Sequence, residues 1–179
     1  MKVLMLNGSP RKNGNIALAF GEMEQVFEKN GVEYENILLG RMDIRGCIAC
    51  ETCRKNHKCA FDDIVNELAG KFEKADGLVI GSPVYYGSAN GTLMSALQRL
   101  FYSTSFDKSL KVGASVVSAR RSGCTATFDE LNKFLLFRIC RLQRVSIGIT
   151  FTVGNRAKEK LMMKEDRLCV YLHETWFSL

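Results

Sequence analysis

Apolar and polar positions along the chain follow a pattern that predicts alternating strands and helices. Short apolar runs closed by glycine, proline or polar residues are typical of buried strands. Such runs lie at 2–6, 77–82 and 112–117. We also expect a second strand at 32–39, and an alternating segment typical of a fifth strand lies at 145–153. Apolar residues recur at helical spacing between and after them. The helices predicted in this way cover 16–29, 62–75, 91–101, 127–137 and 156–176.

This alternation predicts one α/β domain over residues 1–179. Strands that alternate with helices form a parallel sheet with helices on both faces. Ligands of such sheets bind beyond the carboxyl ends of the strands, where the strand order reverses. The loops at 7–15, 83–90 and 118–124 therefore become the candidates for a binding site.

The loop after the first predicted strand has the composition of a phosphate site. Residues 7–15 have the sequence Asn-Gly-Ser-Pro-Arg-Lys-Asn-Gly-Asn. They lead into a helix whose first N–H groups and dipole attract an anion. The side chains that would assist are those of Ser9, Arg11, Asn13 and Asn15. The loop is neither a Walker motif nor a G-x-G-x-x-G fingerprint, which disfavours an NTPase or a dinucleotide site; an ordinary capped surface turn is the alternative.

The next two candidate loops suggest what accompanies the phosphate. Tyr85 and Tyr86 are adjacent in the loop after the third strand. A flat, partly apolar isoalloxazine ring would explain such a pair, because a tyrosine can pack on its face while backbone amides meet its polar edge. A cover over the sheet end or a subunit interface is the alternative. Arg120 and Arg121, after the fourth strand, would serve the flavin or a second, phosphate-bearing nucleotide, or would simply be solvated.

Together the three loops resemble those of the NADPH-dependent FMN reductase and iron–sulfur flavoprotein family. Residues 8–15 are similar to its FMN-phosphate loop and residues 81–88 to its isoalloxazine loop, and the resemblance covers residues 1–134. It implies a flavodoxin-like three-layer sandwich whose five parallel strands have the order 2-1-3-4-5. It also implies bound FMN, NADH or NADPH as reductant, a small-molecule or protein electron acceptor, and a homodimer or homotetramer. The cofactor-binding residues that it implies are Ser9, Arg11, Asn13, Gly14, Asn15, Pro83, Val84, Tyr85, Tyr86, Gly87, Ser88, Ala119, Arg120 and Gly123.

Four of the seven cysteines are close together, at Cys47, Cys50, Cys53 and Cys59. Four thiolates at such spacing hold an iron–sulfur cluster or zinc, and a C-x-x-C pair can act in thiol exchange. The residues alone leave these three interpretations open. The segment resembles the compact cysteine motif of the iron–sulfur flavoproteins, which implies a [4Fe–4S] cluster beside FMN. We interpret His57 as a bystander and expect Cys124, in a site loop, near the flavin.

Composition and charge narrow the classes of partner. Hydrophobic residues make up 46% and charged residues 25%, an ordinary globular balance. Most of the formal net charge of +6 comes from residues after 134, without interleaved aromatic residues, which favours a solvated face over a nucleic-acid site. We see neither a signal sequence nor an apolar run of membrane-spanning length. We therefore expect a cytoplasmic protein that binds neither nucleic acid nor membrane.

The chain departs from the family pattern after Phe134. Relatives continue with Thr-Ile-Ser-Asn-Met-Pro-Val and then a Gln-Tyr-Trp-Asn … His-Gly loop, whereas residues 135–142 have the sequence Leu-Leu-Phe-Arg-Ile-Cys-Arg-Leu. Codons permitted for these residues, read one base out of phase, can spell the family's strand, and those for 143–154 can spell its loop. We therefore expect 135–179 to be a frameshifted, poorly packed tail, a hypothesis that the gene sequence tests.

No side-chain nucleophile or acid–base dyad is expected, because the difficult chemistry would belong to the flavin. Neither His57 nor His173 has a partner at the spacing of a catalytic triad. Two other classes stay open: a non-enzymatic flavodoxin-like electron carrier, and a zinc or thiol redox module on the same scaffold.

Overall fold

The computed structural model describes residues 1–138 and 150–152, and its elements alternate as the hydrophobic pattern predicts. The strands are β1 Lys2–Asn7, β2 Glu33–Leu38, β3 Gly77–Pro83, β4 Val112–Ala119 and β5 Thr150–Thr152. The helices are α1 Asn15–Lys29, α2 Thr52–Asn56, α3 Ile64–Lys74, α4 Gly91–Ser103 and α5 Cys124–Arg138. α2 was not among the predicted helices. The predicted helix at 156–176 lies outside the described residues.

The strands form a parallel sheet with β1 near its centre. The first four strands have the order β2-β1-β3-β4, which confirms that part of the prediction. The three residues of β5 pair with the end of β4, and the rest of the predicted fifth strand is outside the described residues. Asn7 at the end of β1 is paired with Gly81 in β3. The point where the strand order reverses is therefore also where two candidate loops leave the sheet.

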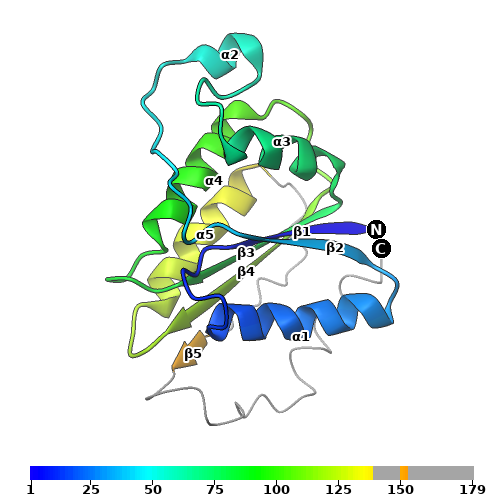
Figure 1. The fold of residues 1–179 in the computed structure, drawn as a ribbon, viewed down its shortest axis with the longest axis vertical. Helices are drawn as coiled ribbons and strands as arrows, with labels where there is room; N and C mark the ends of the chain where they lie inside the picture. The colour runs from blue at the N-terminus through cyan, green and yellow to red at the C-terminus, as the bar shows by residue number, and fades with distance from the viewer. Residues whose placement is uncertain (139–149, 153–179) are drawn as a thin grey trace.

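Helices lie on both faces of the sheet (Figure 1), because each strand alternates its side chains between two cores. Val3 and Met5 pack with α1 on one face. Leu4 and Leu6 pack with α3, α4 and α5 on the other. Burying each such side chain contributes about 1.5–3 kcal/mol. No helix in the described part of the chain is long and apolar enough to cross a membrane.

Two glycines let helices approach the strand ends that carry the loops. A Cβ at Gly81 would lie 2.6 Å from the ring of Phe20 on α1. A Cβ at Gly8 would lie 2.7 Å from Cδ2 of Leu93 on α4. The first and third strands therefore end against helix side chains with no space to spare, which fixes the starting points of their loops.

The end of α5 corrects one expectation about the segment after Phe134. Leu135 is fully buried, and its side chain fills the space at Gly113, where a Cβ would lie 3.0 Å from Leu135 Cδ2. The expectation of poor packing is wrong for this residue, because Leu135 continues the apolar face that Leu131 begins one turn earlier. For 139–149 and 153–179 the expectation falls outside the described residues.

Candidate functional site

The amino end of α1 is open toward the loop that precedes it. Gly14 is the N-cap residue, no side chain caps the helix, and its first turn has no acidic residue. The first N–H groups of α1 therefore lack the partner that a serine, threonine or aspartate cap would give them, and the positive end of the helix dipole is not neutralised. Such an end favours an anion.

The loop before α1 is held in shape from both sides. The Ser9 N–H donates to Asn7 Oδ1 at 2.9 Å, and Ser9 Oγ accepts from the Arg11 N–H at 3.2 Å. Behind it lies Gly40, after β2, where a Cβ would be only 2.3 Å from the Ser9 carbonyl carbon. Arg41 Nε donates to the Pro10 carbonyl. These neighbours therefore hold the loop in shape.

Hydrogen bonds tie the three candidate loops together at the carboxyl edge of the sheet. The Gly8 N–H donates to the Gly81 carbonyl at 2.7 Å. Asn15 Nδ2 donates to Ser118 Oγ at 3.2 Å, and the Ser118 carbonyl accepts from the Val84 N–H at 2.8 Å. The predicted convergence of the loops that follow β1, β3 and β4 is therefore present in the structure.

The loop after β3 turns tightly at its two tyrosines. Tyr85 and Ser88 exchange both backbone hydrogen bonds, at 2.9 and 3.2 Å. Tyr86 and Gly87, between them, have positive φ angles of 52° and 78°. The Tyr86 side chain is fully exposed and that of Tyr85 about half so. The turn thus holds two aromatic side chains toward solvent, at a conformational cost of about 1–3 kcal/mol for Tyr86.

Glu130 on α5 holds this turn in place, although it was not among the predicted site residues. Both carboxylate oxygens accept from Ser88 Oγ, at 2.8 and 3.0 Å, and one also accepts from the Ala89 N–H at 2.9 Å. A signal was present, because Glu130 lies one turn from the buried Thr127 and from Phe134 on the inward face of the predicted helix. A carboxylate on an inward face requires hydrogen-bond partners.

The loop after β4 closes against the same turn. Gly123 has a φ of +91°, and a Cβ there would lie 3.0 Å from both Gly87 Cα and Val84 Cγ1. Cys124 is buried at the start of α5. Only a glycine at 123 permits this approach together with this backbone conformation.

The predicted cofactor-binding residues divide by exposure. Those buried or half-buried are Ser9, Gly14, Asn15, Pro83, Val84, Gly87, Ser88, Ala119 and Gly123. Those exposed are Arg11, Asn13, Tyr85, Tyr86 and Arg120. The buried set shapes the edge of the sheet, and the exposed set surrounds it. Their assignment to a cofactor stays a prediction.

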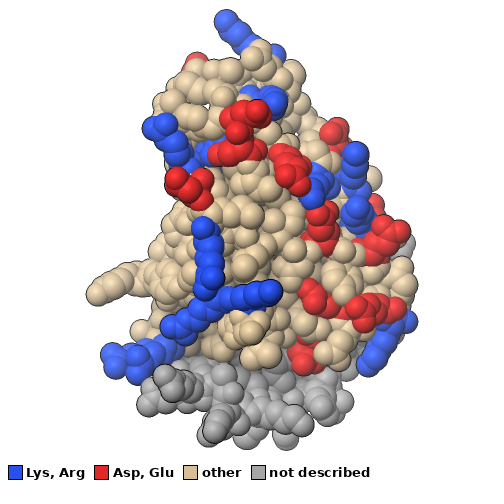
Figure 2. Space-filling model, viewed as in Figure 1, with Lys and Arg blue, Asp and Glu red and all other residues tan. Residues whose placement is uncertain are grey.

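Basic side chains surround this edge. Arg11 and Lys12 after β1, Arg41 after β2, and Arg120 and Arg121 after β4 are all exposed. Figure 2 shows Lys and Arg side chains gathered on the side of the molecule where these strands end, with acidic side chains mostly elsewhere on this face. The resulting positive field suits a ligand that carries phosphate.

The four cysteines of the predicted metal site are not gathered in this structure. Cys47 and Cys50 are exposed, Cys53 and Cys59 are half-buried, and all four are free thiols. In the described residues, no three His, Cys, Asp or Glu side chains are close enough to share a metal ion. The expected four-thiolate cluster is thus not preformed, because the exposed stretch from 47 to 53 has no buried side chain that would draw it inward.

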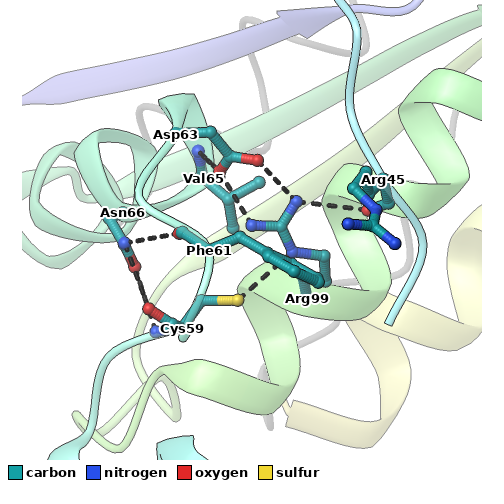
Figure 3. A network of polar contacts seen from close by, with 7 residues as sticks. All are labelled: Arg45, Cys59, Phe61, Asp63, Val65, Asn66 and Arg99. Carbon is teal, nitrogen blue, oxygen red and sulfur yellow. Dashed lines mark hydrogen bonds and ion pairs between the residues drawn. The ribbon is translucent and has the colours of Figure 1, made fainter. Parts of the chain in front are cut away.

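Individual cysteines nevertheless differ in their surroundings. Hydrogen bonds from the Thr52 side chain and backbone lower the pKa of the Cys50 thiol, which favours the thiolate that binds metals. Cys59 Sγ accepts from Arg99 Nε at 3.2 Å (Figure 3). Asp63 is the N-cap of α3, and its side chain accepts from the Val65 N–H. Burial opposes ionisation of Asp63, but hydrogen bonds and the charge of Arg99 outweigh it and lower its pKa.

Comparisons with known proteins show which proteins this chain is similar to. The profile of the NADPH-dependent FMN reductase family matches residues 1–157, which is further along the chain than we expected the resemblance to reach. An iron–sulfur flavoprotein of Methanocaldococcus jannaschii is 34% identical over 139 residues, covering 76% of this chain and 72% of that protein. One of Methanosarcina thermophila is 30% identical over 139 residues, covering 75% and 73%. An archaeal flavodoxin structure, 13% identical, has a TM-score of 0.60 and covers 96% of this chain and 93% of its own, which shows a flavodoxin-like fold.

Proposed function

The chain belongs to the NADPH-dependent FMN reductase family, and we propose that it takes electrons from NADH or NADPH and passes them to a small-molecule or protein acceptor. As a member of this family it is an FMN-dependent oxidoreductase. One observation supports the proposed position of the flavin. The uncapped amino end of α1, the turn Tyr85–Ser88 (the tyrosine turn) and the end of β4 lie at the same edge of the sheet.

The residues at this edge fit FMN. The open N–H groups of α1, with Ser9 and Asn15, offer donors to a phosphate dianion, and Arg11 offers a charge. Gly14 lets the loop fold closely against the start of α1, since a Cβ there would lie 3.1 Å from Arg11 Cβ and 3.4 Å from Ser9 Oγ. FMN, when bound, supplies the redox chemistry, accepting hydride and releasing electrons.

The other two loops would orient the ring. Tyr85 and Tyr86 offer aromatic faces, and the Gly87 turn offers backbone groups to the polar edge of an isoalloxazine. Glu130 holds this turn in place through Ser88 and Ala89. Arg120, beside the same edge, would bind the phosphate of the nicotinamide nucleotide. These residues bind and orient, and none is asked to transfer a proton.

We also propose that Cys47, Cys50, Cys53 and Cys59 hold a [4Fe–4S] cluster, which supplies one-electron transfer. The support is the chemistry of the donor set, the lowered pKa of the Cys50 thiol, and the names of the two relatives, which are called iron–sulfur flavoproteins. The exposed stretch that carries the first three cysteines would close onto Cys59, which is already held in place. Zinc in the same four thiols, or free redox thiols, would be revealed by metal and sulfide analysis of anaerobically purified protein.

We further propose a homodimer or homotetramer, which sedimentation of the FMN-loaded protein would test.

Steady-state oxidation of NADH and NADPH by the reconstituted protein tests the proposed reductase activity. We expect turnover with at least one nicotinamide and an artificial acceptor, at a rate proportional to bound FMN. A protein that binds FMN yet oxidises neither nucleotide would instead be the electron carrier.

A further inference from the structure

We propose that Arg99 is a positioning residue that donates hydrogen bonds to both ends of the cysteine segment, residues 45–59, and raises the reduction potential of the cluster bound there. The inference rests on the cluster of the proposed function, and it concerns a residue outside the four cysteines. Arg99 lies on α4, and its side chain is only 1% exposed.

A single guanidinium joins the chain that enters the segment to the chain that leaves it (Figure 3). Arg99 Nη1 donates to the carbonyl of Arg45, two residues before Cys47, at 3.1 Å. Its Nε donates to Sγ of Cys59, the last of the four cysteines, at 3.2 Å. The two ends of the segment are thus fixed to one buried side chain, while Cys47 and Cys50 between them are exposed and Cys53 is half-buried.

Three further groups fix the guanidinium and the Cys59 backbone. Asp63 accepts from Nη1 and Nη2, each at 2.7 Å, in a bidentate pair. The ring of Phe61 lies 4.9 Å from the guanidinium carbons of both Arg99 and Arg45. Asn66 accepts from the Cys59 N–H at 3.0 Å and donates to the Cys59 carbonyl at 3.2 Å. Cys59 is therefore a pre-organised ligand, which the other three cysteines would join.

The direction of Nε distinguishes this arrangement from a simple ion pair. A buried arginine needs a counter-charge, and the two Nη atoms already reach Asp63. The remaining Nε–H donor points at a sulfur that could ligate iron. A hydrogen bond and a positive charge beside a ligand sulfur stabilise the reduced cluster, which carries one more negative charge, and so raise its potential. The electron is the one that the nicotinamide-reduced flavin would supply.

The test is a redox titration of the cluster in the anaerobically reconstituted full chain, with iron and sulfide counted per chain. In Arg99→Gln we expect the equilibrium between reduced and oxidised cluster to move about tenfold toward the oxidised form. That change is about 59 mV more negative for a one-electron couple. Arg99→Lys keeps the charge and should recover part of the loss. Arg54→Gln removes an exposed arginine of the same segment and should change the potential much less.

Asp63→Asn should shift the reduction potential of the cluster in the opposite direction. The amide can still cap α3, but it removes the counter-charge of Arg99, so the potential should rise. A merely structural role would move both potentials in one direction or neither. Equal potentials in wild type and Arg99→Gln, or shifts of the same sign in Arg99→Gln and Asp63→Asn, would overturn the inference. Should Arg99→Gln not fold, Arg99→Lys and Asp63→Asn decide it by the same criterion. Wild type that takes up no iron and sulfide would instead refute the proposed cluster.

Discussion

Gly40 lies behind the loop that follows β1, with no space between its Cα and the Ser9–Pro10 backbone. A Cβ would come within 2.3–2.5 Å of three backbone atoms of that pair. The shape of the loop is thus set partly by a residue on another strand connection, which no motif in the loop itself would reveal. Single contacts of this kind decide whether the donors around the proposed phosphate site are aimed correctly.

Gly40→Ala should therefore displace the loop. We expect FMN affinity to fall at least about tenfold, or about 1.4 kcal/mol, and stability to fall by about 1–3 kcal/mol. Flavin fluorescence titration and urea unfolding measure the two effects. Gly21→Ala is the matched control. A Cβ at position 21 would meet nothing within 4 Å, and alanine has a higher helix propensity than glycine in the interior of α1. Unchanged FMN affinity in Gly40→Ala would show that the loop does not hold the phosphate.

Glu130→Ala should loosen the tyrosine turn. The Ser88 hydroxyl and the Ala89 N–H lose a charged acceptor, an interaction of about 1.5–3 kcal/mol. We expect FMN to dissociate at least about tenfold faster, as seen by stopped-flow fluorescence. Asp129→Ala removes a carboxylate from an exposed neighbouring position, and FMN should dissociate from this variant at the wild-type rate. Equal rates in the two variants would place the turn outside the flavin site.

Tyr34 provides a pH-dependent readout away from the site. Its hydroxyl donates to Glu28 Oε1 at 2.6 Å, and this hydrogen bond, with burial and nearby carboxylates, raises the pKa of Tyr34 to about 12. Because the folded pKa is raised above the ordinary value of about 10, the contribution to stability is complete below about pH 10 and is lost as the pH rises through about 12. The phenolate absorbance missing from Tyr34→Phe should titrate near 12 in wild type, and at a lower pH in Glu28→Ala, which removes the hydrogen bond that raises the pKa most. A wild-type midpoint near 10 would contradict the contact.

At the scale of elements, the hydrophobic pattern predicted β1, β3 and β4 because buried parallel strands are largely apolar. β3 is the clearest case, with Leu78, Val79 and Ile80 all fully buried. α2 was missed because none of its residues is buried, so it has no apolar periodicity to detect. The loops of the site were predictable from their places after strands. The roles of Glu130 and Arg99 could not be predicted. The partners of Glu130 are at least 41 residues away in sequence and those of Arg99 at least 36, so only the fold brings them together.

The end of α5 tests where core packing stops. Leu135→Ala should cost about 2–5 kcal/mol of stability, because its side chain is fully buried beside Gly113. Leu136→Ala, one residue on and 54% exposed, should stay within about 0.5 kcal/mol of wild type. Urea unfolding of the full chain measures both. Similar stabilities for the two variants would mean that the helix is not packed on the sheet beyond Phe134.

At the scale of the whole molecule, one edge of the sheet combines the open helix end, the tyrosine turn and a positive field. The cysteine segment is anchored separately, by α4 and the start of α3. The protein thereby has a sheet edge whose loops are joined by hydrogen bonds, and a separate exposed segment that a metal would have to close. The most economical account is that the first binds the flavin by its phosphate.

Anaerobic titration of the full chain with FMN and with riboflavin, followed by flavin fluorescence, tests that account. Riboflavin presents the same ring without the phosphate that α1, Ser9 and Asn15 are inferred to hold. We expect saturable quenching at one FMN per chain, with riboflavin bound at least about a hundredfold more weakly because it lacks charge-assisted hydrogen bonds. Equal affinity for the two flavins, or no quenching by either, would contradict the account.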